Sequence, residues 1–482
     1  MKKVHLVIYL IALIGLVSCD YVQIKALFGN DEAQDQMGDR YHDGADGWEQ
    51  DFDKAYKWYL KAANKGYAPA QNSVGYYYNK GLAVERDLSI AFEWYSKAAE
   101  QGNPAALYNL GLFYSTGENG LAINHSKAYD LYRQAAEKKH PLAQSALGNC
   151  FRFGNGVSVD MEEAVRWFRR SAIQQNSSGQ YRLGDMYLNG LGVERDEATA
   201  FVLFKLSAEQ GNTDAQNALG HCYFHGKGVA QDTILAIEWT KKSAEGGNSN
   251  GLLNLGHMYR GGYGYIKSDY SKAMQYFKEA SEKGNPIADY SIGSMYLSGQ
   301  GVELNEDTAI SYFIKSANAG CSDAQYEMAK RYATGNGLEE NDSIGWEYLL
   351  KAANQNHMLA LYDLAEYYAY YEDFCEAILW YTKAANLGHA ESQWDLGYCY
   401  FKGIGVEESD ETAVEWWTKS AEQGYAASQN ALGVCYMNGY GVYRDLEVAE
   451  KWLRSAYEQG FEDAYNNLMR CINMRVQRYI ND

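Results

Sequence analysis

One type of segment repeats along the whole chain with a period near 36 residues. Ala215 to Asn250 reads AQNALGHCYFHGKGVAQDTILAIEWTKKSAEGGNSN, and segments of the same residue types precede and follow it. The units begin at Ala33, Ala70, Ala106, Ala143, Gly179, Ala215, Gly251, Ala288, Ala324, Ala360, Ser392, Ser428 and Ala464. Such a period is typical of a solenoid, in which each unit contacts only its neighbours. A motif that recurs in every unit therefore indicates a structural role and not an active site.

Each unit is predicted to form a helical hairpin. After Ala215, apolar residues recur at three- and four-residue steps until Gly226 and Gly228 interrupt the pattern. A second amphipathic stretch runs from about Thr233 to Ala244, and Gly247 follows it. Below, the first stretch of every unit is called helix A and the second helix B. The sequence thus predicts an all-α protein.

Glycines mark two fixed places in the unit. One ends helix B, where glycine takes a left-handed C-cap at little cost, and Asn356 replaces it once. These stop residues are Gly66, Gly102, Gly211, Gly247, Gly284, Gly320, Gly388, Gly424 and Gly460. The other is the sixth position of helix A, as at Gly75, Gly148, Gly220 and Gly433. A glycine inside a helix costs about 1 kcal/mol, so its recurrence predicts a close helix–helix approach, which we expect against the alanine pairs of helix B.

The chain is rich in aromatic residues, with 43 tyrosines and 11 tryptophans. Most recur at fixed positions of the two helices, so we interpret them as core and as packing between repeats. Representative members are Tyr114, Tyr187, Tyr223, Tyr296 and Tyr436 in helix A, and Trp58, Trp94, Trp167, Trp239, Trp380, Trp416 and Trp452 in helix B.

The recurring pattern Ala-x-x-x-Leu-Gly-x-x-Tyr, Gly-x-Gly-Val-x-x-Asp, then Ala-x-x-Trp-x-x-Lys-Ala-Ala-x-x-Gly resembles the Sel-one-like repeat (SLR), a relative of the tetratricopeptide repeat. The resemblance covers residues 33–463 in about twelve copies. It implies a right-handed α-superhelical solenoid that binds proteins or peptides, usually as an adaptor or scaffold. By analogy with tetratricopeptide arrays, it also implies an inner groove lined by variable positions of helix A.

Two parts of the array depart from the pattern. The unit from Ala360 has 32 residues, lacks the Gly-x-Gly loop and carries Ala365 where glycine is usual, so we expect a tight turn near Tyr371-Glu372-Asp373 and a local change in curvature. The last segment, residues 464–482, is predicted to be a polar-faced capping helix, which the end of a solenoid requires. It carries Arg470, Arg475 and Arg478.

The first residues predict export and lipid attachment. Lys2 and Lys3 precede an apolar run that is too short to span a membrane, and Leu16-Val17-Ser18-Cys19 is similar to a bacterial lipobox. We interpret residues 1–18 as a lipoprotein signal peptide, Cys19 as the acylated residue and 19–32 as a stalk. The protein would then be anchored in the cell envelope, and the sequence does not decide between the inner and the outer membrane. The alternative is an ordinary signal peptide.

The composition argues against several function classes. A formal net charge of −19 opposes nucleic-acid binding, which needs a basic surface. The Gly-x-Gly pairs follow helices and recur across units, so they do not predict a phosphate loop. No Ser/His/Asp order and no carboxylate pair stands out, and we expect neither an enzyme nor a cofactor.

Cysteines and histidines are the residue types in this chain that could form a disulfide or a metal site. Cys150, Cys222, Cys399, Cys435 and Cys471 share one position of helix A. Equivalent positions in neighbouring units lie about 10 Å apart, beyond the ~7 Å limit of a disulfide, so buried free thiols are predicted. The histidine cluster His221, His225 and His257 favours a polar groove wall over a metal site, because no further ligand completes it.

The third position of helix A is aromatic in four successive units, and this block is the predicted binding site. It comprises Tyr290, Tyr326, Tyr362 and Trp394, with Tyr398 and Glu366 beside them. An exposed aromatic ladder resembles a peptide-recognition groove, and inter-repeat packing is the other interpretation. The sequence thus favours a lipoprotein scaffold that binds a protein or peptide. A cell-wall hydrolase and a secreted host-interacting effector or adhesin are the alternatives.

Overall fold

The computed structural model describes residues 21–44 and 47–481, and the side chains of 478–481 are left aside. The predicted signal peptide, Cys19 and the side chain of Arg478 therefore lie outside what it describes. Within the described ranges the chain is helical, with no strand, as predicted. None of the described helices combines the length and the apolar character needed to cross a bilayer.

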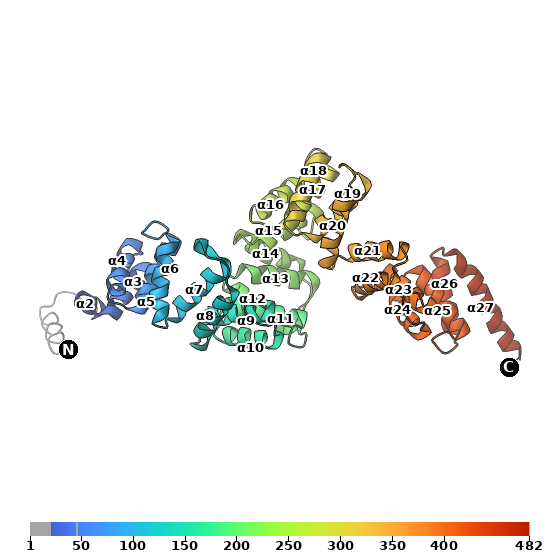
Figure 1. Ribbon diagram of the computed structural model, residues 1–482, viewed down its shortest axis with the longest axis horizontal. Helices are drawn as coiled ribbons and strands as arrows, with labels where there is room; N and C mark the ends of the chain where they lie inside the picture. The colour runs from blue at the N-terminus through green and yellow to red at the C-terminus, as the bar shows by residue number, and fades with distance from the viewer. Residues whose placement is uncertain (1–20, 45–46, 482) are drawn as a thin grey trace. The chain divides into compact units, whose positions relative to one another are not determined.

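Helices α3 to α26 form twelve successive hairpins (Figure 1), which confirms the predicted helix A and helix B of each repeat. The A helices are α3 (Asp31–Asp43), α5 (Ala68–Lys80), α7 (Pro104–Thr116), α9 (Pro141–Phe153), α11 (Ser177–Asn189), α13 (Thr213–His225), α15 (Ser249–Gly261), α17 (Pro286–Ser298), α19 (Ser322–Thr334), α21 (Met358–Tyr370), α23 (Ala390–Lys402) and α25 (Ala426–Asn438). The B helices are α4 (Phe52–Ala63), α6 (Leu88–Glu100), α8 (His125–Glu137), α10 (Met161–Ile173), α12 (Glu197–Glu209), α14 (Thr233–Glu245), α16 (Tyr270–Glu282), α18 (Glu306–Asn318), α20 (Asp342–Asn354), α22 (Phe374–Asn386), α24 (Asp410–Glu422) and α26 (Leu446–Glu458).

The chain divides into two compact units, residues 1–251 and 252–482. Within each unit a B helix packs against the A helix of the next repeat, as α4 packs on α5 and α22 on α23. This nearest-neighbour packing makes each unit a stretch of solenoid. The right-handedness of the superhelix stays a prediction.

The helix ends explain why aspartate and glycine recur at fixed positions of the sequence. The aspartate that follows Gly-x-Gly-Val is the N-cap of helix B; for example, Asp196 accepts a hydrogen bond from the Thr199 backbone N–H at 3.0 Å. All nine stop glycines have positive φ, from 75° to 96°, and Asn356 has φ 60°. The predicted left-handed caps are thus confirmed. Lys139 and Gln175 take the same conformation in the two repeats without glycine or asparagine there.

The glycine in the middle of helix A does mark a close approach, but our expected partner was wrong. A Cβ added to Gly148 would lie 2.5 Å from the ring of Phe168, and one added to Gly75 would lie 2.8 Å from the ring of Tyr95. The glycine therefore makes room for a large side chain of its own helix B, and not for the alanine pairs. The alanines, such as Ala62, are buried elsewhere in the core.

The aromatic residues serve mainly as core, as predicted. Tyr59, Tyr77, Tyr95 and Tyr132 are almost fully buried. The tryptophans of helix B are buried or half-buried, and several are covered by a cation one turn later. Such pairs are Lys61 over Trp58, Lys97 over Trp94, Arg170 over Trp167, Lys242 over Trp239, Lys383 over Trp380 and Lys419 over Trp416, at 3.8–4.5 Å from the ring centroid.

In most repeats the Gly-x-Gly loop covers the start of the B helix of the preceding repeat. A Cβ on the second glycine of the loop would collide with the first residue of that helix: Gly301 with Tyr270, Gly405 with Phe374, and Gly441 with Asp410. Only a residue without a side chain leaves room for this approach, which explains the second glycine of Gly-x-Gly. The loop therefore belongs to the interface between repeats.

Both ends of the array carry an additional helix. Helix α2 (Tyr21–Leu27) lies within the segment expected to be a stalk, and its Ile24 and Ala26 are buried, Ala26 in a cluster with Ala33 and Met37 of α3. Helix α27 (Glu462–Asn481) packs against α26 at the place expected for the capping helix. Its Arg475 pairs with Glu447 and Glu450.

Candidate peptide-binding face of the A helices

The four rings of the predicted ladder are half-buried and lie on α17, α19, α21 and α23, all in the second unit. Three of them pack on the residue just before the next A helix. Tyr326 stacks on His357 at 4.6 Å between ring centroids, Tyr362 lies 4.8 Å from His389, and Trp394 lies 6.4 Å from Tyr425. The rings therefore contribute to the packing between repeats and also present an edge to solvent.

Tyr290 differs from the other three ladder residues. Its ring packs on Phe313 of its own helix B at 5.4 Å, and burial raises the pKa of its hydroxyl. It belongs more to the core than to the surface.

Hydrogen bonds fix the polar ends of the ladder. The hydroxyl of Tyr326 donates to Oδ2 of Asp363 on the next A helix at 2.9 Å. The hydroxyl of Tyr381 donates to Glu366, which is exposed, and Trp417 Nε1 donates to the backbone carbonyl of Trp394 at 3.0 Å. Of the ladder side chains, Tyr326 is held in one orientation by such a bond, which reduces the entropy that a partner must remove on binding there.

Tyr398 provides the exposed part of the predicted site. Its ring stacks on Trp394 with centroids 5.8 Å apart, and 41% of the residue is exposed. Phe401, on the same helix, packs on Trp417 at 5.4 Å and on Tyr440 at 6.0 Å instead of joining the ladder. Tyr398 and Glu366 are thus the accessible members of the predicted set.

Carboxylates give this face an acidic character. The pKa of Asp395 is raised to about 7, first by burial and then by the nearby charges of Glu366 and Glu391. The pKa of Asp363 is also raised by burial, although the hydrogen bond from Tyr326 opposes that effect. Because Glu366 and Glu391 are exposed carboxylates beside Asp395, the face favours basic groups over acidic ones.

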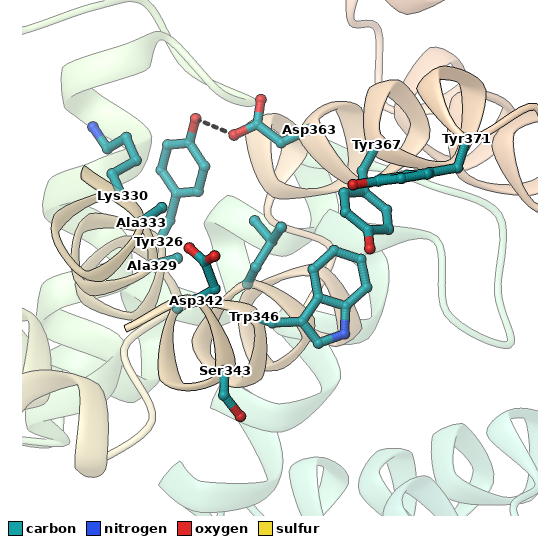
Figure 2. A pocket seen from close by; sticks show the side chains of 12 residues that line it. Tyr326, Ala329, Lys330, Ala333, Asp342, Ser343, Trp346, Asp363, Tyr367 and Tyr371 are labelled. Carbon is teal, nitrogen blue, oxygen red and sulfur yellow. Dashed lines mark hydrogen bonds between the residues drawn. The ribbon is translucent and has the colours of Figure 1, made fainter. Parts of the chain in front are cut away.

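A pocket of about 550 Å³ opens beside the ladder, between α19, α20 and α21. Figure 2 shows Tyr326 and Lys330 on one side of it and Trp346, Tyr367 and Tyr371 on the other. Asp342 and Asp363 contribute the carboxylates. Trp346 and Asp342 were not predicted from the sequence, although the shortened repeat from Ala360 points to this place.

The three histidines pack on different partners. The rings of His221 and His225 lie 4.4 Å apart, whereas His257 packs on Phe277 at 4.9 Å. Burial lowers the pKa of His221 and of His257. Within the described ranges, no group of three or more His, Cys, Asp or Glu residues is arranged to hold a metal ion.

The predicted free thiols are confirmed. Seven cysteines lie within the described residues and all are unpaired; six are buried, including Cys321, and Cys375 is exposed. Burial raises the pKa of the thiols of Cys150, Cys222 and Cys399 to about 11 and that of Cys435 to about 12.

The hairpins coincide with a known repeat family. The Sel1 repeat matches residues 31–67, 68–103, 104–140, 141–176, 177–212, 213–248, 249–285, 286–321, 322–357, 359–389, 390–425 and 426–461, one match for each A and B pair. The chain is a Sel1-repeat protein. The shortest match, 359–389, is the repeat without the Gly-x-Gly loop.

Solved Sel1-repeat structures resemble the chain. A protective antigen present in uropathogenic Escherichia coli strains, described as displaying an SLR fold, is 35% identical over 87% of this chain and 90% of its own, with a TM-score of 0.45. A Sel1 repeat protein from Oxalobacter formigenes is 32% identical over 51% of this chain and 96% of its own, also with a TM-score of 0.45. The comparison with curated proteins finds no match.

Proposed function

We propose that this Sel1-repeat protein is a non-catalytic interaction scaffold, anchored in the bacterial cell envelope by a lipid on Cys19, that binds a protein or peptide along α17, α19, α21 and α23. The aromatic block on these helices carries the proposal. Tyr398 and Tyr367 are 41% and 43% exposed beside the half-buried Trp394 and Tyr326. Clustered tyrosine and tryptophan side chains on a rigid surface are the residues that dominate binding energy in protein interfaces.

Repeat architecture supports the same function. Stacked hairpins present an extended surface on which each repeat contributes a few side chains, so a long partner segment can be contacted at several points. The lipobox-like Leu16-Val17-Ser18-Cys19 supports the anchor, and two or three acyl chains would hold the protein at a membrane without a spanning helix.

The anchor is tested by mass spectrometry of the mature N-terminus. The expected result is a chain that begins at acylated Cys19 and partitions into detergent, whereas Cys19→Ser partitions into water. A mature protein without lipid would contradict the anchor and favour the secreted form. This experiment does not depend on which face binds a partner.

The binding face is tested by crosslinking and capture from cells that express the protein. Tyr398→Ala and Tyr367→Ala should each reduce the yield of the same captured partner. Tyr443→Ala is the matched control, because Tyr443 is 98% exposed and lies in the loop before α26, away from the A-helix surface. Equal capture by all three variants would contradict the assigned face.

A host-facing role is the second candidate, because the chain is 35% identical to a protective antigen. Protease treatment of intact cells distinguishes the two. Loss of the protein would favour the host-facing role, and protection until the envelope is opened would favour the internal scaffold.

A further inference from the structure

The short repeat leaves the start of one B helix uncovered. In the second unit, loop glycines of the following repeat pack on the starts of α16, α18, α22 and α24; a Cβ on Gly337, for example, would lie 3.1 Å from Glu306 Oε1. The repeat that follows α20 has only Tyr371 and Glu372 between α21 and the N-cap Asp373. No Gly-x-Gly loop is therefore available to cover Asp342, the first residue of α20.

The uncovered helix start lines the pocket described above. Asp342, Ser343 and Gly345 of the first turn of α20 form one wall, together with Trp346. In α18 the residue equivalent to Trp346 is Ile310, which Gly337 covers so closely that Ile310 is 4% exposed. Trp346 is only partly buried, and its ring lies 4.4 Å from that of Tyr367. The pocket is thus the space that a loop occupies in the other repeats.

Two carboxylates give the pocket its charge. Asp342 is exposed and has no hydrogen bond or ion pair with any described residue. Asp363 accepts one hydrogen bond, from Tyr326, through Oδ2. Figure 2 shows both carboxylates on the Tyr326 side of the space, with Trp346, Tyr367 and Tyr371 on the opposite side. Carboxylates beside aromatic faces attract ammonium and guanidinium groups.

The one lysine in the pocket offsets only part of this charge. Lys330 lies over the ring of Tyr326, with Nζ 5.0 Å from the centroid, and pairs with Glu327 at 3.1 Å. In Figure 2 its ammonium group points away from Trp346. The net charge of the pocket is therefore negative, and Asp342 and Asp363 carry it.

We infer that this pocket binds a lysine or arginine side chain carried by an extended segment of a protein partner, which takes the place of the absent loop. The cation lies between the carboxylates of Asp342 and Asp363, and its aliphatic stem lies along the aromatic wall. This inference rests on the proposed scaffold function and names the chemistry of the partner. An acidic segment is excluded by the same two carboxylates.

The test is a selection of random twelve-residue peptides displayed on phage, performed on the purified full chain. Selected peptides should share a lysine or arginine, and synthetic copies with norleucine or glutamate at that position should bind at least ten-fold more weakly. Asp342→Asn should lower the affinity of the protein for the parent peptides about five- to ten-fold. Asp410→Asn is the matched control, because Asp410 begins α24 and is covered by Gly441.

A second variant closes the pocket and leaves both carboxylates in place. Tyr371-Glu372 is replaced by the sequence of 335–340, Gly-Asn-Gly-Leu-Glu-Glu, which restores the usual length of the repeat. This variant should keep its helical circular dichroism spectrum and should no longer bind the selected peptides.

The inference is overturned by a selection that enriches no peptide, by enriched peptides without a basic residue, or by equal binding to the wild type and Asp342→Asn. Neither the lipid nor Tyr398 is involved, so failure of this test leaves the anchor test and the Tyr398→Ala capture test standing, whereas Tyr367 lines the pocket and belongs to both.

Discussion

Gln210 Nε2 donates a hydrogen bond to Gln180 Oε1 at 2.7 Å, across the boundary between two successive repeats. The same bond, at the same spacing of thirty residues, joins Gln174 to Gln144, Gln355 to Gln325, Gln423 to Gln393 and Gln459 to Gln429. The accepting glutamine, which follows the opening alanine of the unit, often also donates to a backbone carbonyl eight residues earlier, as Gln144 does to Ala136. This glutamine therefore joins the repeats to each other.

One of these glutamine–glutamine hydrogen bonds is missing, and restoring it should stabilise the protein. Gln216 Oε1 is buried without a partner, because the residue thirty positions later is Gly246. Gly246→Gln combined with Thr213→Ser, which relieves the contact of the new Cβ with the Thr213 methyl, should raise the free energy of unfolding by about 1–2 kcal/mol. Urea denaturation measures the change against Thr213→Ser alone. Equal midpoints for the two variants would contradict the role of the bond.

A methyl group on the mid-helix glycine should destabilise the hairpin. The Cβ of Gly148→Ala would lie 2.5 Å from the Phe168 ring, so we expect a loss of about 1–3 kcal/mol. Phe168→Leu in the same chain should recover part of that loss, and a double-mutant cycle by thermal and urea unfolding measures the coupling. Additive effects of the two substitutions would show that the ring is not the limiting contact.

The buried carboxyl of Asp395 should make the protein less stable as pH rises. Its pKa is raised to about 7 in the folded protein, above the ~3.9 expected in the unfolded chain, so the folded state binds more protons between these values. The stability that Asp395 contributes is therefore present below pH 4 and is lost as the pH rises to about 7. Asp395→Asn should be more stable than the wild type by roughly 1–3 kcal/mol at pH 8, and this advantage should shrink toward pH 4. A difference that stays constant between pH 4 and pH 8 would contradict the raised pKa.

Only one thiol of the described residues should react in the folded protein. Cys375 is exposed, whereas Cys222 and Cys435 are buried with raised pKa values and little thiolate at neutral pH. Peptide mapping after brief treatment with a maleimide should therefore find the label on Cys375, and the buried thiols should react only in denaturant. Cys375→Ser removes the fast reaction. Rapid labelling of Cys222 without denaturant would contradict the packing of α13.

Repetition explains why so much of the fold was predicted from sequence. Because each repeat folds against its neighbours, the same helical pattern appears twelve times, with a stop glycine in nine repeats, and a departure in one unit can be judged against the others. The helix pairs, the left-handed caps at residues such as Gly66, and the buried position of Cys150 and Cys222 followed from spacing alone. These features depend on interactions within a few turns of helix.

Contacts between distant residues were decided only in the tertiary structure. The sequence marked the mid-helix glycine but not its partner Phe168, because that contact depends on how helix A and helix B are rotated about their axes. It marked Tyr326 but not its bond to Asp363, 37 residues later in the next repeat. It marked the missing loop after Tyr370 but not the pocket, since a deletion becomes a cavity only where Trp346 and Asp342 of the preceding repeat lie beneath it. Spacing specifies local helices, whereas the side chains exposed by a departure from the repeat depend on packing in three dimensions.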